Sequence, residues 1–360
     1  MKKNIISITG IRPDFIRMKQ IFTELDKNFN HILVHTGQHY SKMLSNVFFN
    51  ELSIRKPDYN LSIGGKNNEH FHQLANLSVN IIELIRNKNL NPDCIIFLGD
   101  SNSVSSSISL KKEGYKIAHI EAGMRSYDKR MLEEINRTVC DHCSDFNFVY
   151  HKDYKLNLLK ENISKKNIYV VGNTIVEVSK IFYSKIVIEN KKNNLILADI
   201  HRPENFLYKN RLKKIISLLN MYSRHYNLPV YLLNFNRTLS KIREFDIELG
   251  NIKLINLMSY KDFLVNQYHA LFVVSDSGTA QEEAAIFKTP VITPRDFTER
   301  PLSMFYNCSY LFKLSFFERS YKESIKYLSK IKSKKLKISS SWLGRGLTSK
   351  MIVRILKEKL

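Results

Sequence analysis

Short apolar runs alternate with amphipathic segments along almost the whole chain, and this alternation restricts the fold more than any other feature. The amphipathic segments, such as residues 72–87 and 209–224, carry apolar residues at helical spacing. Strand and helix signals that alternate in this way predict parallel β-sheets with helices on both faces. The predicted strands are residues 4–9, 31–35, 94–99, 116–120, 146–150 and 168–171, then 195–200, 230–233, 253–257, 271–275 and 290–293.

The predicted strands are too numerous for one open sheet of this kind, and 360 residues exceed what one hydrophobic core usually holds. We therefore predict an α/β protein with two Rossmann-like, doubly wound parallel-sheet domains that face a cleft. The first domain covers residues 1–172 and the second covers residues 173–344, and a final helix within 345–360 is expected to pack back on the first domain. Such sheets bind ligands at the carboxyl ends of their strands, so functional residues are expected there.

The composition is that of a globular protein, with 43% hydrophobic and 25% charged residues. No apolar run approaches the roughly 18 residues that a membrane helix needs. The apolar core of the start, MKKNIISITGIRP, is too short for a signal peptide. We therefore expect a cytoplasmic protein without membrane insertion, in which the four cysteines are reduced.

The net charge of +22 indicates an anionic partner of some kind. A nucleic-acid binder is one interpretation. However, the lysines are scattered, and no nucleic-acid-binding signature accompanies the densest run, KIKSKKLK at residues 330–337. We favour a basic surface together with a pocket for an anionic substrate, and we expect no nucleic-acid partner.

Charged and polar residues gather where the predicted strands of the first domain end. Arg12 stands beside Pro13, which suits the first turn of a helix, and a helix N-terminus with an arginine is a good phosphate site. His39, in HTGQHY, is predicted to line a pocket. Asp100, in LGDSNS, directly follows a strand and is either a functional acid or a helix cap.

The stretch HIEAGMRSYDKRMLEEINRTVCDHC, residues 119–143, holds three glutamates and three arginines. Glu121 directly follows a buried strand, where a carboxylate is costly unless it is paired or functional. Glu133 begins a helix, whose dipole it also complements, and Arg137 lies on the next face. The end of the stretch, CDHC, has no second pair of ligands at zinc spacing, so we interpret it as helix packing and expect no metal.

The second domain offers a different set of groups. His201, in HRPENF, follows a strand and has an ordinary pKa near neutrality. The segment Ser277-Gly278-Thr279 opens a helix, and its N–H groups suit a pyrophosphate. Glu283 lies one turn further, where a carboxylate can bind a ribose diol, and Arg300 lies in RDFTERP after the next strand. This combination is typical of nucleotide-sugar chemistry and needs no cofactor.

These motifs resemble one known family when they are taken in order. The chain is similar to the non-hydrolysing UDP-N-acetylglucosamine 2-epimerases of bacteria and archaea in GIRPDFIRM, HTGQHY, LGDSNS, HIEAGMRS, EEINR, VVGNT, HRPENF, SDSGTAQEEA and RDFTERP. The resemblance implies two Rossmann-like domains in the glycosyltransferase-B arrangement, a UDP-sugar substrate, no cofactor and a homodimer. It also implies that UDP-GlcNAc and UDP-ManNAc are interconverted, for cell-surface polysaccharide synthesis, by elimination of UDP to a 2-acetamidoglucal and re-addition.

The resemblance also implies roles for individual residues. The family's catalytic carboxylates correspond to Asp100, Glu121 and Glu133, and its essential histidine near the diphosphate corresponds to His201. The residues that contact UDP correspond to Arg12, to Ser277, Gly278 and Thr279 at the phosphates, to Glu283 at the ribose and to Phe263 beside the uracil. Which carboxylate acts as acid and which as base stays open.

The chain departs from the family pattern at the substrate rim. It has GIRPD where the family has GTRPE, Leu132 where the family has proline, and Thr279 where the family has a second glycine. The sugar therefore stays open, and a 6-deoxy, 2,3-diacetamido or uronic derivative of a UDP-HexNAc is an alternative substrate. A hydrolysing 2-epimerase that releases ManNAc and a glycosyltransferase of the same fold are further alternatives.

Overall fold

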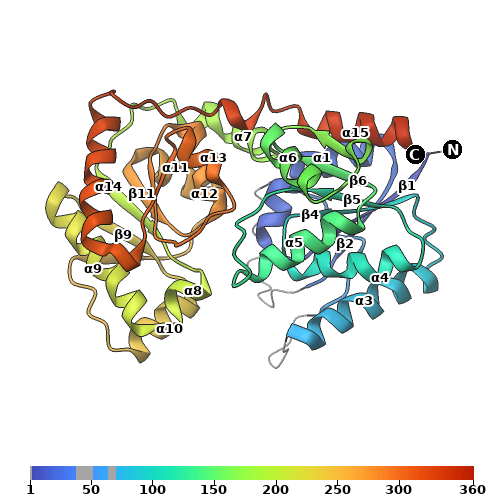
Figure 1. The fold of residues 1–360 in the computed structure, drawn as a ribbon, viewed down its shortest axis with the longest axis horizontal. Helices are drawn as coiled ribbons and strands as arrows, with labels where there is room; N and C mark the ends of the chain where they lie inside the picture. The colour runs from blue at the N-terminus through green and yellow to red at the C-terminus, as the bar shows by residue number, and fades with distance from the viewer. Residues whose placement is uncertain (1, 38–51, 64–69) are drawn as a thin grey trace. The chain divides into compact units, whose positions relative to one another are not determined.

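The structure is a computed structural model that describes residues 2–37, 52–63 and 70–360. The chain divides into two compact units, which we call unit 1 (Met1–Val178 with Leu343–Leu360) and unit 2 (Ser179–Trp342). Helix α7 (Ile175–Ile186) spans the boundary. Each unit contains one parallel β-sheet with helices on both faces (Figure 1), which confirms the predicted α/β class with two doubly wound sheets.

Unit 1 contains a seven-stranded parallel sheet with the order β3-β2-β1-β4-β5-β6-β7. Its strands are β1 (Asn4–Thr9), β2 (Asn30–His35), β3 (Tyr59–Asn60), β4 (Cys94–Leu98), β5 (Ile117–Ile120), β6 (Phe146–Val149) and β7 (Ile168–Val170). The strands β4, β5 and β6 are buried along their whole length, as expected for strands covered on both faces.

Two groups of helices cover this sheet on opposite faces (Figure 1). The helices of one group are α3 (His70–Asn87), α4 (Ser107–Lys112) with η1 (Asn102–Ser106), and α5 (Leu132–Cys143); those of the other are α1 (Arg12–Asn28), α6 (Lys152–Lys160) and α15 (Thr348–Lys359). Helix α15 packs against α1, and the Thr348 hydroxyl donates to the Val171 carbonyl at 3.1 Å. A short turn, η2 (Lys165–Asn167), precedes β7.

Unit 2 contains a six-stranded parallel sheet with the order β10-β9-β8-β11-β12-β13. Its strands are β8 (Leu195–Asp199), β9 (Val230–Leu233), β10 (Ile252–Ile255), β11 (Ala270–Ser275), β12 (Val291–Thr293) and β13 (Ser309–Leu311). Its helices are α8 (Pro203–Phe206), α9 (Lys209–Tyr226), α10 (Asn236–Glu244), α11 (Tyr260–His269), α12 (Gly278–Phe287), α13 (Pro301–Phe305) and α14 (Phe317–Lys332), with η3 (Leu314–Phe316) and η4 (Ser341–Leu343).

Alternate residues of the central strand β8 enter two cores, one on each side of the sheet. Ile196 and Ala198 pack with α8, α9, α10 and α14, whereas Leu195 and Leu197 pack with α11 and α12. This arrangement explains why β8 reads as a continuous apolar run rather than an alternating one. Among the described residues, no helix has both the length and the apolar character that a membrane crossing requires.

The order of the strands reverses beside the first strand of each sheet. β1 pairs with β2 on one side and β4 on the other, and β8 pairs likewise with β9 and β11. In open α/β sheets, ligands bind at this reversal, beyond the carboxyl ends of the strands. Asp100 follows β4 in unit 1, and His201 and Asp276 follow β8 and β11 in unit 2. The fold thus places candidate site residues at the reversal point of each sheet.

Candidate active site

Glu121 is the central residue of a buried charge cluster in unit 1. It follows β5 with a φ of 75°, a left-handed conformation that is strained for a residue other than glycine, and its side chain is 3% exposed. Its carboxylate pairs with Arg17 of α1, lies 3.5 Å from Arg137 Nη2 of α5, and accepts from the Tyr150 hydroxyl at 3.5 Å. The sequence required a partner for this carboxylate, and the structure supplies two guanidinium groups.

Asp100 belongs to the same cluster. Its carboxylate, which is 21% exposed, pairs with Arg137, so Arg137 connects Asp100 to Glu121. The Arg137 side chain is 0% exposed. The structure therefore brings together three of the predicted site residues, and it places Arg137 beneath the two carboxylates. Because both carboxylates share one cation, their mutual repulsion is offset.

The paired glutamates at the start of α5 differ in their surroundings. Glu134 is buried and accepts from the Ser126 N–H at 2.8 Å, the Ser126 hydroxyl at 2.9 Å and the Tyr127 N–H at 2.9 Å. It therefore fixes the loop before α5. Glu133 is half-buried in the first turn of the helix.

The loop after β1 is held by Asp14. The buried Asp14 carboxylate accepts from the N–H groups of Gly10 at 2.8 Å and Ile11 at 3.1 Å. Burial raises the pKa of Asp14 to about 7, although these two hydrogen bonds lower it, and the nearby Asp100 and Glu121 raise it further. Arg12 is the first residue of α1, and its side chain lies outside the described part of the structure, as does the whole of His39.

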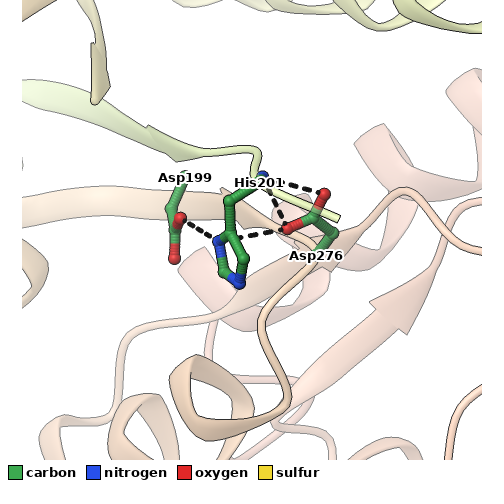
Figure 2. Close-up of side chains that lie close together, drawn as sticks. All are labelled: Asp199, His201 and Asp276. Atoms are coloured by element: carbon green, nitrogen blue, oxygen red, sulfur yellow. Dashed lines mark hydrogen bonds and ion pairs between the residues drawn. The ribbon is translucent and has the colours of Figure 1, made fainter. Parts of the chain in front are cut away.

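In unit 2, His201 lies between two carboxylates (Figure 2). Its Nδ1 lies 2.7 Å from Asp199 Oδ1 and 3.5 Å from Asp276 Oδ1, and its second ring nitrogen points away from both acids (Figure 2). Asp276 is fully buried and accepts from the N–H groups of His201 and Arg202 and from the Asn205 amide. The acids therefore fix both the backbone and the ring of His201.

The charges around His201 favour its protonated form. Burial lowers its pKa, but the Asp199 and Asp276 carboxylates outweigh this effect and raise the pKa to about 9. The ring is 35% exposed, so an anion can reach it. At neutral pH this arrangement presents an imidazolium N–H, held by buried acids, at the reversal point of the second sheet.

The same three side chains also have the donor atoms of a metal site. One ligand atom each of Asp199, His201 and Asp276 lie within 4.8 Å of one another. Both oxygens of Asp276 already accept hydrogen bonds from the backbone N–H of His201 and from the Asn205 amide, so this carboxylate holds the loop after β8. The cysteines of CDHC lie elsewhere, with Cys140 buried in the core of unit 1.

The segment Ser277-Gly278-Thr279 begins α12, as expected for a phosphate-binding helix start. The Arg300 guanidinium lies directly beneath Gly278: a Cβ on Gly278 would come within 2.1 Å of Arg300 Nη1. Arg300 is held in place because it pairs with the buried acids Glu282, at 2.8 Å, and Glu299. The predicted ligand Arg300 therefore lies under the helix start, in a buried ion-pair network.

The two predicted nucleoside contacts are carried by neighbouring helices of unit 2. Glu283 is 1% exposed and accepts from the Tyr260 hydroxyl at 2.6 Å. Phe263 lies on the same helix as Tyr260, α11, and is partly buried against the core of Leu195 and Leu197. The structure brings α11 against α12, and so brings the elements that carry these two residues together.

The residues that hold these side chains were missed by sequence reasoning. Arg17 and Tyr150 hold Glu121, and Asp199 and Asp276 hold His201. A signal was present for two of them. Arg17 stands within the apolar stretch FIRM of α1, and Asp199 ends the apolar strand LILAD. A charged residue at a buried position needs a partner, and that requirement identifies both.

Glu121→Gln leaves Arg17 and Arg137 without their shared anion, so we expect it to lower the free energy of unfolding by about 3 kcal/mol or more. The matched variant is Glu113→Gln, whose carboxylate forms an exposed ion pair with Arg86 and which we expect to cost about 1 kcal/mol or less. Urea denaturation measures both. Equal losses for the two variants would contradict the paired position of Glu121.

Gly278→Ala places a methyl group against an arginine that is paired with two buried acids. Although alanine favours helix, we expect a net loss of about 1–3 kcal/mol from overpacking and a weaker affinity for UDP. Ser277→Ala, at the preceding half-buried position whose side chain makes no cap hydrogen bond, is the control and should leave stability unchanged. Urea denaturation and calorimetric titration with UDP test this, and an unperturbed Gly278→Ala would show that Arg300 is free to shift.

The chain is similar to known proteins over most of its length. The family model described as UDP-N-acetylglucosamine 2-epimerase matches residues 23–357. The chain is 38% identical over 324 residues to the UDP-N-acetylglucosamine 2-epimerase of Methanococcus maripaludis, covering 84% of this chain and 86% of that protein. It is 32% identical over 303 residues to the UDP-2,3-diacetamido-2,3-dideoxy-D-glucuronate 2-epimerase of Pseudomonas aeruginosa, covering 82% and 84%.

The fold is similar to a solved structure along nearly its whole length. The crystal structure of the Methanocaldococcus jannaschii UDP-GlcNAc 2-epimerase in complex with UDP-GlcNAc and UDP superposes with a TM-score of 0.89. The two proteins are 32% identical in sequence, and the match covers 98% of this chain and 99% of the other. The ordered motifs, the two doubly wound sheets and these matches together show that the chain belongs to the UDP-N-acetylglucosamine 2-epimerase family.

Proposed function

We propose that this chain is a UDP-N-acetylglucosamine 2-epimerase, an isomerase that interconverts UDP-GlcNAc and UDP-ManNAc. The observation that carries the proposal is the similarity over most of the chain to a protein of that name, at 38% identity. The relative named for a diacetamido glucuronate sugar is less similar, at 32%. The difference favours the unmodified sugar over the modified ones.

The reaction makes and breaks bonds at C1 and C2 of the sugar. Removal of the C2 proton and cleavage of the C1–O bond release UDP and leave a 2-acetamidoglucal. Re-addition of UDP at C1, with a proton delivered to the other face of C2, gives the epimer, so atoms and charges balance. The C2 proton is weakly acidic, so a positioned base must act together with stabilisation of the leaving group.

The carboxylates of unit 1 are proposed to exchange the protons. A proton leaves one face of C2 and another is delivered to the opposite face, so more than one acid–base group is needed. Asp100, Glu121 and Glu133 are the three candidates. Asp100 and Glu121 are oriented by Arg137, so the pair is positioned before substrate arrives. This preorganisation matches what elimination at a weak acid requires.

The groups of unit 2 are proposed to stabilise the departing UDP. The His201 imidazolium offers an N–H and a positive charge to the diphosphate, and its acids hold it in that form. The start of α12 at Ser277-Gly278-Thr279 adds backbone N–H groups and the positive end of a helix dipole. Glu283 and Phe263 are proposed to contact the ribose and the uracil.

The resemblance to the family extends the proposal to the setting of the reaction. We propose a cytoplasmic homodimer that supplies UDP-ManNAc for cell-surface polysaccharide. Sedimentation equilibrium of the purified chain tests the dimer, because a monomer at micromolar concentration would contradict it.

In deuterated water with UDP-GlcNAc, we expect UDP-ManNAc to form and both recovered UDP-sugars to carry deuterium at C2, as seen by proton NMR. Asp100→Asn should reduce turnover at least about 100-fold, because an acid–base group is lost. Glu113→Gln, an exposed acid of the same unit, is the control and should keep wild-type turnover. Free ManNAc with UDP would identify a hydrolysing enzyme, and turnover of only a modified UDP-sugar would overturn the substrate.

The pH profile of kcat/KM should report His201. Its folded pKa of about 9 lies above the ordinary 6.5, so the imidazolium persists through neutral pH and activity falls as pH rises through about 9. Asp199→Asn removes the largest charge that raises this pKa, so the alkaline fall should move toward neutrality. Asp246→Asn, an exposed aspartate of unit 2, should leave the profile unchanged. An unchanged pH profile in Asp199→Asn would contradict the assignment of the alkaline fall in kcat/KM to His201.

A further inference from the structure

A second buried ion pair lies behind the carboxylates of unit 1, and none of the proposed catalytic steps uses it. His119 of β5 is 0% exposed, with its Nδ1 at 2.6 Å from Asp141 Oδ1 and its Nε2 at 2.8 Å from the Gly99 carbonyl oxygen. Asp141 is also 0% exposed. Both residues belong to the stretch 119–143, and Asp141 stands inside CDHC, the segment that suggested zinc or plain packing.

The partners of His119 require both of its ring nitrogens to donate. A backbone carbonyl and an ionised carboxylate are acceptors only, so the ring carries two protons and a positive charge. Burial lowers the pKa of His119, but the Cys140 thiol and the Asp141 carboxylate raise it, which leaves it well above its ordinary value. A buried imidazolium–carboxylate pair of this kind is rigid, because each group depends on the other for compensation of its charge.

The two ends of this pair reach the loops that carry the two paired carboxylates. His119 holds the Gly99 carbonyl, which directly precedes Asp100. The second oxygen of Asp141 accepts from the Gly123 N–H at 3.0 Å, in the turn that begins at Glu121, and lies 2.7 Å from Arg125 Nη2. Arg125 in turn binds Glu161 through two hydrogen bonds of 2.8 and 2.7 Å.

The Glu121 turn needs such support because a positive φ is strained for a residue other than glycine. Gly99, Glu121 and Gly123 have φ angles of 78°, 75° and 75°. A Cβ on Gly123 would come within 2.4 Å of the Tyr154 carbonyl oxygen, so this turn is pressed against α6. The Asp100 carbonyl is held separately, by the Asn136 amide at 3.0 Å.

We propose that His119 and Asp141 are positioning residues that lock the Asp100 loop and the Glu121 turn to each other, so that both carboxylates meet Arg137 in one geometry. This inference rests on the proposed function, since it assigns the pair a role in proton exchange at C2. A misplacement of about 1 Å can reduce a rate about 100-fold. The pair therefore acts on the rate of the chemical step and leaves nucleotide affinity unchanged.

Two substitutions of His119 separate its two hydrogen bonds. His119→Asn keeps an N–H near the position of Nδ1, facing Asp141, and loses the bond to Gly99. His119→Gln keeps an N–H near the position of Nε2, facing Gly99. We expect His119→Asn to reduce kcat about 100-fold, and His119→Gln about 10-fold, while the Kd for UDP changes less than about twofold. Asp141→Asn leaves a single oxygen for the two donors, His119 and the Gly123 N–H, and removes the negative charge, so it should match or exceed the loss in His119→Asn.

The matched control is His31→Asn on the neighbouring part of the same sheet. The His31 side chain is also 0% exposed, with Nδ1 at 2.5 Å from Asp26 and Nε2 at 3.0 Å from the Ser7 hydroxyl. It touches neither carboxylate loop, so His31→Asn should leave kcat unchanged. Wild-type kcat in His119→Asn, or an equal loss in His31→Asn, would overturn the proposal.

A readout independent of turnover separates this inference from the proposed function. Nitrogen-15 NMR of the wild-type protein should show both ring nitrogens of His119 protonated from pH 6 to 8. Amide hydrogen exchange at residues 99–101 and 121–123 should accelerate in His119→Asn and stay unchanged in His31→Asn. If the wild type epimerises no UDP-sugar, the proposed function fails alone, whereas a singly protonated His119 or unchanged exchange in His119→Asn refutes the positioning pair.

Discussion

Arg137 is a fully buried guanidinium shared by two carboxylates from successive strands of one sheet. Asp100 and Glu121 follow β4 and β5, whose ends lie side by side, so their charges would repel strongly without a cation between them. The guanidinium can serve both because its planar fork has donors on more than one side. The surrounding groups hold this arrangement in one geometry. Arg17 and Tyr150 contact the Glu121 carboxylate, and His119 holds the loop that carries Asp100.

In unit 2 the charges are reversed, because a cation is held in place by buried anions. There the exposed group is a cation, His201, and the buried supports are anions, Asp199 and Asp276. In both units the group that can reach a ligand is held by a more deeply buried partner of opposite charge. The consequence is a fixed charge pattern: carboxylates at the reversal point of one sheet, and an imidazolium and a helix start at that of the other.

Much of the fold could be predicted from local patterns, because central strands such as β4 and β8 are apolar throughout. The short edge strands β3 and β13 could not, since two or three partly buried residues carry no pattern of their own. In the site, the residues at strand ends were visible as charges after apolar runs. The residues that support them were not visible. Asp141 lies inside CDHC, which suggested a metal motif or helix packing. Its partner His119 is 22 residues away in sequence and becomes adjacent only when β5 and α5 pack together.

The chain returns to unit 1 in α15, so unit 1 is completed only after unit 2 has been synthesised. Unit 2 is inserted between Val178 and Leu343, so α15 is synthesised after the whole of unit 2. Helix α1, the loop at Val171 and the start of α7 at Glu177 therefore lack their covering helix until the whole of unit 2 has been synthesised. On the ribosome, unit 2 can close its sheet first, and the carboxylate-bearing unit is the last to become complete.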